Sequence, residues 1–214
     1  MTTPVSIDVV SDVVCPWCYL GKARLEHAIA LVPELDVTVR WRPYQLDPSV
    51  PPEGLDRAEY MAKKFGDLKA LEGAHKRLVD MGRAEGIEYN FEAQKRAANT
   101  INAHRLIRWA GAEGKESDVM TRLFSANFRE GRDIGNIAVL ADIAGEAGMD
   151  RAAIAAKLAT DEDRAAVLAE IQDAYQIGVT GVPTFILGQK YGVVGAQSVE
   201  VLADAIRQVA TKAA

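Results

Sequence analysis

The chain has 214 residues, of which 49% are hydrophobic and 26% are charged, and its net charge at pH 7 is −5. This length allows one domain with a large insertion or two small domains, and the composition is that of an ordinary globular protein. The acidic balance argues against a nucleic-acid partner. No stretch approaches the roughly 20 apolar residues of a membrane span, so a membrane partner is not expected either.

The N-terminal part of the chain predicts a strand, a helix and a second strand. Residues 5–10 and 36–41 alternate apolar and polar side chains, as half-buried strands do. Between them, apolar residues recur with the period of an amphipathic helix from 15 to about 31, and Pro33 ends that helix. A crossover of this length predicts a right-handed parallel βαβ unit. The helix then begins at the carboxyl end of the first strand, where open α/β sheets place their functional sites.

A proline-rich connection at 48–54 leads into a long helical region. The predicted helices cover residues 56–65, 68–85, 100–112, 117–130, 136–147, 151–158 and 161–177. Glycines separate most of them, and Thr160-x-x-Asp163 resembles a capping box at the start of the last one.

Strands return near the C-terminus. Residues 183–187 and 191–194 form a predicted hairpin around Gly188-Gln189, and residues 195–198 open a final helix. The sequence therefore predicts an α/β fold with a four-stranded βαβ…ββα core and a large all-helical insertion. We assign residues 1–48 and 179–214 to the core and 49–178 to the helical insertion domain, whose last helix, within 161–178, packs on the core.

The segment Cys15-Pro16-Trp17-Cys18 contains the chain's two cysteines. Residues three apart share one face of a helix, so both sulfurs can approach each other at one helix end. Pro16 suits the first helical position, which makes Cys15 the N-cap residue. There the free N–H groups of the first turn and the helix dipole stabilise a thiolate over a thiol.

Two other interpretations of this pair are open. A zinc site needs further ligands, and the chain offers no third cysteine, while His27, His75 and His104 lack ligand spacing. A pair of inert buried cysteines is the second alternative. The position of the pair between a strand and a helix favours reversible dithiol–disulfide chemistry instead.

The segment Thr180-Gly181-Val182-Pro183-Thr184 is the second feature of interest. A trans proline at the head of a strand is the ordinary case, since only about 5–6% of X–Pro bonds are cis. The predicted sheet, however, brings this loop against the helix end that carries Cys15. A cis Val182–Pro183 bond would expose the backbone of Val182 there to an extended substrate.

These features together resemble the DsbA-like branch of the thioredoxin superfamily, with its thioredoxin-like fold and helical insertion. Residues 41–46 (WRPYQL), 99–105 (NTINAHR) and 192–197 (GVVGAQ) also resemble its FrnE-type oxidoreductases. The resemblance implies that Cys15 is the nucleophile, Cys18 the resolving thiol and Pro183 a cis-proline facing them. The dipeptide Pro16-Trp17 would tune the stability of the reduced pair. The expected activity is thiol–disulfide exchange or isomerisation, with a redox-active disulfide and no tightly bound cofactor.

Two departures separate the chain from secreted DsbA-type oxidants. Residues 1–4 carry neither a basic segment nor an apolar run, so no secretory signal is expected and the cytoplasm is the expected location. There a disulfide is more often catalytic than structural. The chain also lacks the further cysteines of some FrnE-type proteins. Both departures weaken a role in oxidising exported proteins.

Related families suggest a different activity. Hydroxychromene-carboxylate isomerases and kappa-class glutathione transferases share this architecture but generally use a serine to hold glutathione, so Cys15 disfavours them. Glutathione remains a candidate co-substrate, with its carboxylate at Gln197 and Ser198 near the start of the last helix. Asn99 and His104 are further candidate substrate-binding residues, with a helix cap and a core-edge residue as the structural alternatives.

A chaperone-like binding module built on the helical insertion is the non-enzymatic alternative. The expected partners are thiol or disulfide substrates, whether proteins or small molecules, and homodimer formation is left open. The reduction potential of the Cys15–Cys18 couple is the most informative single measurement.

Overall fold

The computed structural model describes residues 3–66 and 68–213 and contains a four-stranded sheet in the order β2-β1-β5-β6. The strands are β1 (Thr3–Ser11), β2 (Leu35–Pro43), β5 (Thr184–Leu187) and β6 (Tyr191–Val194). As predicted, β1 and β2 are parallel, and β5 and β6 form an antiparallel hairpin. The structure adds that β5 pairs antiparallel with β1.

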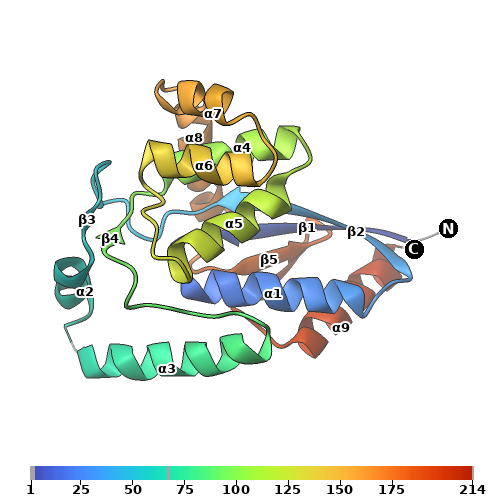
Figure 1. Ribbon diagram of the computed structural model, residues 1–214. Coiled ribbons are helices and arrows are strands. Elements are labelled where there is room, and N and C mark those ends of the chain that lie inside the picture. The colour runs from blue at the N-terminus through green and yellow to red at the C-terminus, as the bar shows by residue number, and fades with distance from the viewer. Residues whose placement is uncertain (1–2, 67, 214) are drawn as a thin grey trace.

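Helices cover both faces of this sheet (Figure 1). Helix α1 (Pro16–Ala30) and helix α9 (Val199–Ala213) pack together and against β1. Val5, Ile7 and Val9 of β1 point into the same core as these helices. Val10, one residue on, points the opposite way toward Ala174 of helix α8 (Arg164–Gln176), because successive strand side chains alternate between the faces.

The insertion between β2 and β5 holds the remaining helices of the described residues. They are α2 (Arg57–Phe65), α3 (Leu68–Ala84), α4 (Ile101–Ala112), α5 (Glu116–Phe128), α6 (Ile137–Glu146) and α7 (Arg151–Leu158). Helices α4 to α7 share one continuous hydrophobic core with the sheet, α1 and α9. The domain boundaries at 49 and 178 therefore stay a prediction about independent folding.

Helices α2 and α3 are held differently from the other helices. The two-residue strands β3 (Leu55–Asp56) and β4 (Arg96–Ala97) pair antiparallel at the base of this segment. The sequence carries no signal for these two strands, because two residues show no periodicity. Leu78 of α3 packs with Leu20 of α1 in a separate small cluster, so α3 lies along the helix that carries the cysteines.

The predicted capping box at Thr160 is wrong. Helix α8 begins at Arg164, not Asp161, and Asp163 is its N-cap, with φ of 60° and no side-chain capping bond. The carboxylate of Asp163 instead accepts a hydrogen bond from Nε1 of Trp109 at 2.8 Å. The hydroxyl of Thr160 accepts from the amide of Glu162. The Asp163 carboxylate, which the local pattern assigned to helix capping, therefore accepts a hydrogen bond from the distant Trp109 instead.

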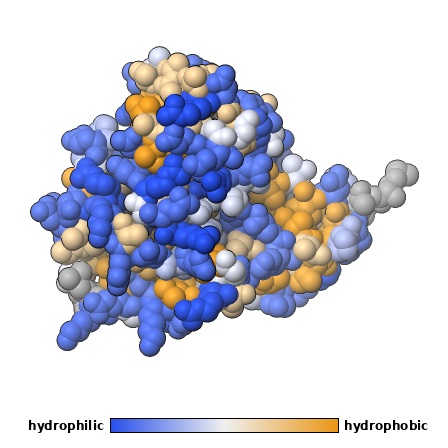
Figure 2. Space-filling model, viewed as in Figure 1, coloured by the Kyte–Doolittle hydropathy of each residue, from blue (hydrophilic) through white to orange (hydrophobic). Residues whose placement is uncertain are grey.

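The surface on the side shown in Figure 2 is mostly hydrophilic, and apolar residues gather toward the end of the molecule where the two termini lie. Among the residues that the structure describes, no helix has the length and hydrophobicity needed to cross a membrane.

Candidate active site

Cys15 is the N-cap of α1, with Pro16 at the first helical position, as predicted. Its backbone is extended, with φ of −91° and ψ of 113°. The Cys15 amide donates to the carbonyl of Asp12 at 3.0 Å, and the Cys15 carbonyl accepts from the amide of Cys18 at 3.0 Å. The first helical turn and the preceding tight turn therefore fix the direction of the Cys15 side chain.

Cys18 lies one turn further along α1, behind Cys15. Both cysteines are free thiols. Burial raises the pKa of the Cys18 thiol well above its usual value, and a hydrogen bond with Cys15 raises it further. Cys15 lines the large cavity described below, whereas Cys18 does not. The first thiol is therefore accessible from the cavity, and the second is reached only through the first.

The loop that contains Val182 and Pro183 faces Cys15, and the Val182–Pro183 peptide bond is cis, as predicted. The thiol of Cys15 lies 3.7 Å from the carbonyl oxygen of Val182. The amide of Gly195 donates to the carbonyl of Pro183 at 2.8 Å. Gly21 of α1 sits directly under the proline ring, where an added Cβ would lie 2.8 Å from Cγ of Pro183.

A cavity of about 510 Å³ opens beside Cys15. One wall comes from the active-site segment and its facing loop, and the opposite wall comes from the insertion. The wall near the cysteine contains Cys15, Pro16, Trp17, Gly181 and Val182, and the insertion contributes Arg57, Tyr60, Met61, Lys64, Phe65, Leu71, Ala74, His75 and Leu78. Its volume falls within the range of about 300–1,000 Å³ typical of small-molecule sites.

Asp47 anchors α2 over this cavity. Its carboxylate accepts hydrogen bonds from the hydroxyl of Tyr60 at 2.8 Å and from Nζ of Lys64 at 3.0 Å. The hydroxyl and amide of Ser49 also donate to it. These bonds, with that from the Ser49 hydroxyl first, hold the pKa of Asp47 well below its usual range. The hydrogen bonds of Asp47 thus attach the segment between β2 and β3 to α2.

Asp12 is a site residue that the sequence analysis missed. It is fully buried and lines the cavity. One carboxylate oxygen accepts from the amide of Leu46 at 2.8 Å, and the other lies 3.4 Å from Nε2 of His104. The only sequence signal was an acidic residue directly after a buried strand and three residues before Cys15.

The second missed group in the cavity lining is a pair of buried amide side chains. Gln94 and Asn127 both line the cavity and are both buried. Nε2 of Gln94 donates to Oδ1 of Asn127 at 2.7 Å, and Nδ2 of Asn127 donates to the carbonyl of Val13 at 3.2 Å. This pair connects the insertion to the turn before Cys15.

The four candidate binding residues outside the cysteine motif do not line this cavity. His104 stands behind Asp12, where Nε2 is 2.9 Å from the carbonyl oxygen of Tyr44. Nδ2 of Asn99 donates to the carbonyl of Val50, and its Oδ1 accepts from the amide of Ile101. The remaining two, Gln197 and Ser198, bond locally to Val194 and Val201 at the start of α9. Their predicted role in binding substrate or glutathione stays a prediction.

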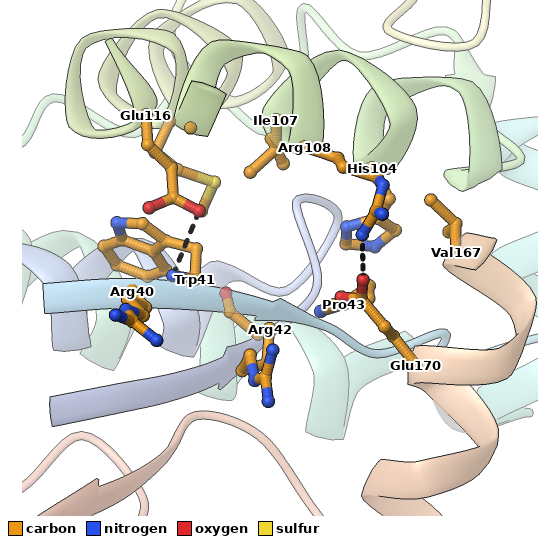
Figure 3. Close-up of a pocket in the computed structure, with 13 residues that line it drawn as sticks. Arg40, Trp41, Arg42, Pro43, His104, Ile107, Arg108, Glu116, Val167 and Glu170 are labelled. Carbon is orange, nitrogen blue, oxygen red and sulfur yellow. Dashed lines mark hydrogen bonds and ion pairs between the residues drawn. The ribbon is translucent and has the colours of Figure 1, made fainter. Parts of the chain in front are cut away.

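A second cavity, of about 250 Å³, lies at the edge of β2 beneath α4 and α5 and contains neither cysteine (Figure 3). Figure 3 shows Glu116 reaching from α5 toward β2, where its carboxylate accepts from the amide of Trp41 at 3.2 Å. Burial raises the pKa of Glu116 to about 7. Across residues 3–66 and 68–213, no three His, Cys, Asp or Glu side chains come together as a metal site.

A cysteine pair at the N-terminus of the first helix, facing a cis-proline loop on a βαβ…ββα sheet, defines a protein of the thioredoxin-like class. The family model for the DSBA-like thioredoxin domain matches residues 6–207. The chain belongs to that family.

Individual relatives agree with this assignment. YwbO of Bacillus subtilis strain 168, an uncharacterized protein, is 34% identical over 86% of this chain and 87% of its own length. The crystal structure of the probable DsbA oxidoreductase SCO1869 from Streptomyces coelicolor is 32% identical, with a TM-score of 0.89, over 96% of this chain and 89% of that one. A 2-hydroxychromene-2-carboxylate isomerase, 20% identical with a TM-score of 0.72 over 97% of both chains, shares the fold.

The close approach of Gly21 to Pro183 gives the first prediction. Gly21→Ala should lower the free energy of unfolding by about 1–3 kcal/mol, because the new Cβ overpacks the contact with the proline ring. Gly73→Ala is the matched control, since nothing lies within 4 Å of its added Cβ on α3. It should stabilise the protein by about 0.5–1 kcal/mol through helix propensity. Denaturant unfolding measures both, and equal stability of the two variants would contradict the close contact.

Glu116 gives a pH prediction. Its folded pKa of about 7 lies above its unfolded value, so the folded state binds the proton more tightly. Stability should therefore fall as the pH rises from the unfolded pKa through about 7. Glu116→Gln keeps an acceptor for the Trp41 amide but cannot ionise. Because the carboxyl is partly solvated, we expect wild type to lose about 1 kcal/mol relative to the variant over this range, or about 2–4 °C in Tm.

Thermal melts of both proteins at mildly acidic and mildly alkaline pH measure that difference. Parallel pH profiles for the two proteins would show that Glu116 titrates as an ordinary surface carboxyl.

Proposed function

We propose that this chain is a thiol–disulfide oxidoreductase of the FrnE type that exchanges disulfides through Cys15 and Cys18. The observation that carries the proposal is the ordered access to the two sulfurs. Cys15 lines a substrate-sized cavity at a helix N-terminus, and Cys18 is enclosed directly behind it. Disulfide exchange needs this arrangement, because one thiol must attack the substrate and the other must attack the first.

The forward reaction takes two steps. The Cys15 thiolate attacks one sulfur of a substrate disulfide, the substrate S–S bond breaks, and the first substrate thiol leaves. Cys18 then gives up its proton and attacks the Cys15 sulfur, which releases the second substrate thiol and leaves a Cys15–Cys18 disulfide. The positive end of the α1 dipole stabilises negative charge at Cys15. The raised pKa of Cys18 keeps that thiol protonated until the second step.

The Val182 carbonyl stands beside the reacting sulfur. At 3.7 Å from Cys15, it is placed to accept a hydrogen bond from the backbone of an extended substrate or from the thiol itself. The proposed substrate is therefore a thiol or a disulfide, on a protein or on a small molecule. The proposed reaction uses no tightly bound cofactor. We also place the reaction in the cytoplasm, and cell fractionation tests that compartment.

A glutathione-dependent isomerase acting on a small aromatic compound is the second candidate. The apolar and aromatic side chains of the cavity, such as Tyr60, Phe65 and Leu78, favour it. The buried second thiol disfavours it, because an isomerase needs only one residue to orient bound glutathione.

The nucleophile assignment predicts selective chemistry. Alkylation at mildly acidic pH should label Cys15 well before Cys18, because only Cys15 lines the cavity. Cys18→Ser should accumulate mixed disulfides with substrate, since the resolving thiol is gone. Cys15→Ser is the matched control and should trap none. Mass spectrometry of the trapped species measures both, and labelling of Cys18 first would reverse the assignment.

The two candidate activities respond differently to Cys18→Ala. This substitution should abolish catalytic insulin reduction with a dithiol donor and leave any glutathione-dependent isomerisation of an aromatic substrate largely intact. We expect wild type to catalyse the first reaction. Isomerase turnover by a wild-type protein that fails to exchange disulfides would establish the second candidate and make Cys18 a packing residue.

A further inference from the structure

The lining of the cavity beside Cys15 includes one positively charged side chain, Arg57, that has no partner among the described residues. Arg57 is the first residue of α2, is half-buried and lines the cavity. Its backbone amide donates to the carbonyl of Lys95 at 3.0 Å. No side chain or carbonyl within the described ranges forms a hydrogen bond or ion pair with its guanidinium.

An unpaired, partly buried guanidinium is costly, because it loses hydration without gaining a partner. Burial lowers the pKa of Arg57, and its charge adds to the effect of burial in lowering the pKa of His75 nearby. An anionic ligand would remove this cost with a paired, charge-assisted hydrogen bond.

The other charged side chains of the cavity have partners within the protein. Asp12 accepts from the amide of Leu46, and its second oxygen lies 3.4 Å from Nε2 of His104. Lys64 bonds to Asp47 and Tyr60, and Asp47 accepts from four donors in all. Nη2 of Arg96 donates to the carbonyl of Glu53. Arg57 is therefore the cationic group of the cavity lining whose side chain has no hydrogen-bond or ion-pair partner, among the residues that the structure describes.

Apolar side chains line the cavity with Arg57, together with the polar side chains of His75 and Gln94. Met61 and Leu71 line the cavity together with Arg57, and the wall continues through Phe65 and Leu78. A ligand that fills this space needs an apolar or aromatic body, and the guanidinium selects an anionic group on that body.

We infer that the cavity takes a small disulfide, or the corresponding thiol, that has an apolar body and a carboxylate. The body fills the space under α2 and α3, the carboxylate pairs with Arg57, and the sulfur lies at Cys15. This inference rests on the proposed thiol–disulfide exchange and specifies its substrate class. In the reaction, the enzyme dithiol and one disulfide give the Cys15–Cys18 disulfide and two substrate thiols.

The test uses two aromatic disulfides of equal size. Dithiodibenzoate has a carboxylate on each ring, and dithiodibenzamide is its neutral amide. Reduced full-length protein is mixed with each, and the rate of enzyme oxidation is followed by thiol release. Arg57→Gln should lower the second-order rate constant for the carboxylate at least about tenfold, the effect of losing roughly 1.4 kcal/mol. The rate constant for the amide should change less than about twofold.

Two further variants control the result. Arg57→Lys keeps the charge but not the paired donors, and it should recover part of the rate with the carboxylate. Arg77→Gln removes the same charge from an exposed position on α3 outside the cavity lining, and it should match wild type. Circular dichroism confirms that each variant is folded.

The outcomes distinguish a wrong role for Arg57 from a wrong reaction. If Arg57→Gln slows both disulfides equally, or neither, the assignment of Arg57 as the carboxylate site is wrong while thiol–disulfide exchange stands. If wild type reduces insulin but reacts with neither aromatic disulfide, the inferred substrate class is wrong while thiol–disulfide exchange stands. If wild type also fails to reduce insulin, and Cys18→Ser traps no mixed disulfide, the proposed exchange reaction itself is wrong.

Discussion

The first turn of α1 is held in place from three directions, and the geometry of both cysteines depends on that anchoring. The hydroxyl of Tyr89 donates to the carbonyl of Pro16 at 2.6 Å. The ring of Tyr19 stacks on Phe124 with centroids 5.1 Å apart. On another side, Gly21 lets the ring of Pro183 approach the helix. Two of these contacts come from the helical insertion, so the insertion acts as part of the active-site scaffold.

Buried polar groups complete that scaffold on the sheet side. Asp12 and His104 are fully or nearly fully buried and lie 3.4 Å apart, next to the turn that precedes Cys15. Buried polar groups are retained only where hydrogen bonds compensate for the loss of water. Here the amide of Leu46 donates to one oxygen of Asp12, and the carbonyl of Tyr44 lies 2.9 Å from Nε2 of His104. The second oxygen of Asp12 has the contact with His104 and no hydrogen bond among the described residues. The polar network therefore links β1, the segment after β2 and α4 at one point behind the cysteines.

Local sequence signals predicted the elements that build the site, and long-range packing decided the rest. The N-cap position of Cys15, the parallel βαβ unit and the C-terminal hairpin followed from local patterns. The cis bond before Pro183 was implied by the family resemblance. The contact between Asp12 and His104 joins residues 92 positions apart, so no local pattern could predict it. The same limit explains Thr160, because Trp109 takes the carboxylate of Asp163. The sequence did not indicate Arg57 as a binding residue, because the lack of a partner for a charged side chain can be recognised only in the folded structure.

Helix α2 differs from the rest of the protein in one respect with wide consequences. None of its residues is buried, and Asp47 attaches it through hydrogen bonds and an ion pair to Lys64. The cysteines, by contrast, stand in the continuous hydrophobic core. Residues of α2 can therefore change during evolution with little effect on folding or on the sulfur chemistry. On this plan, the lining of the cavity under α2 can be altered without disturbing the packing around the two cysteines.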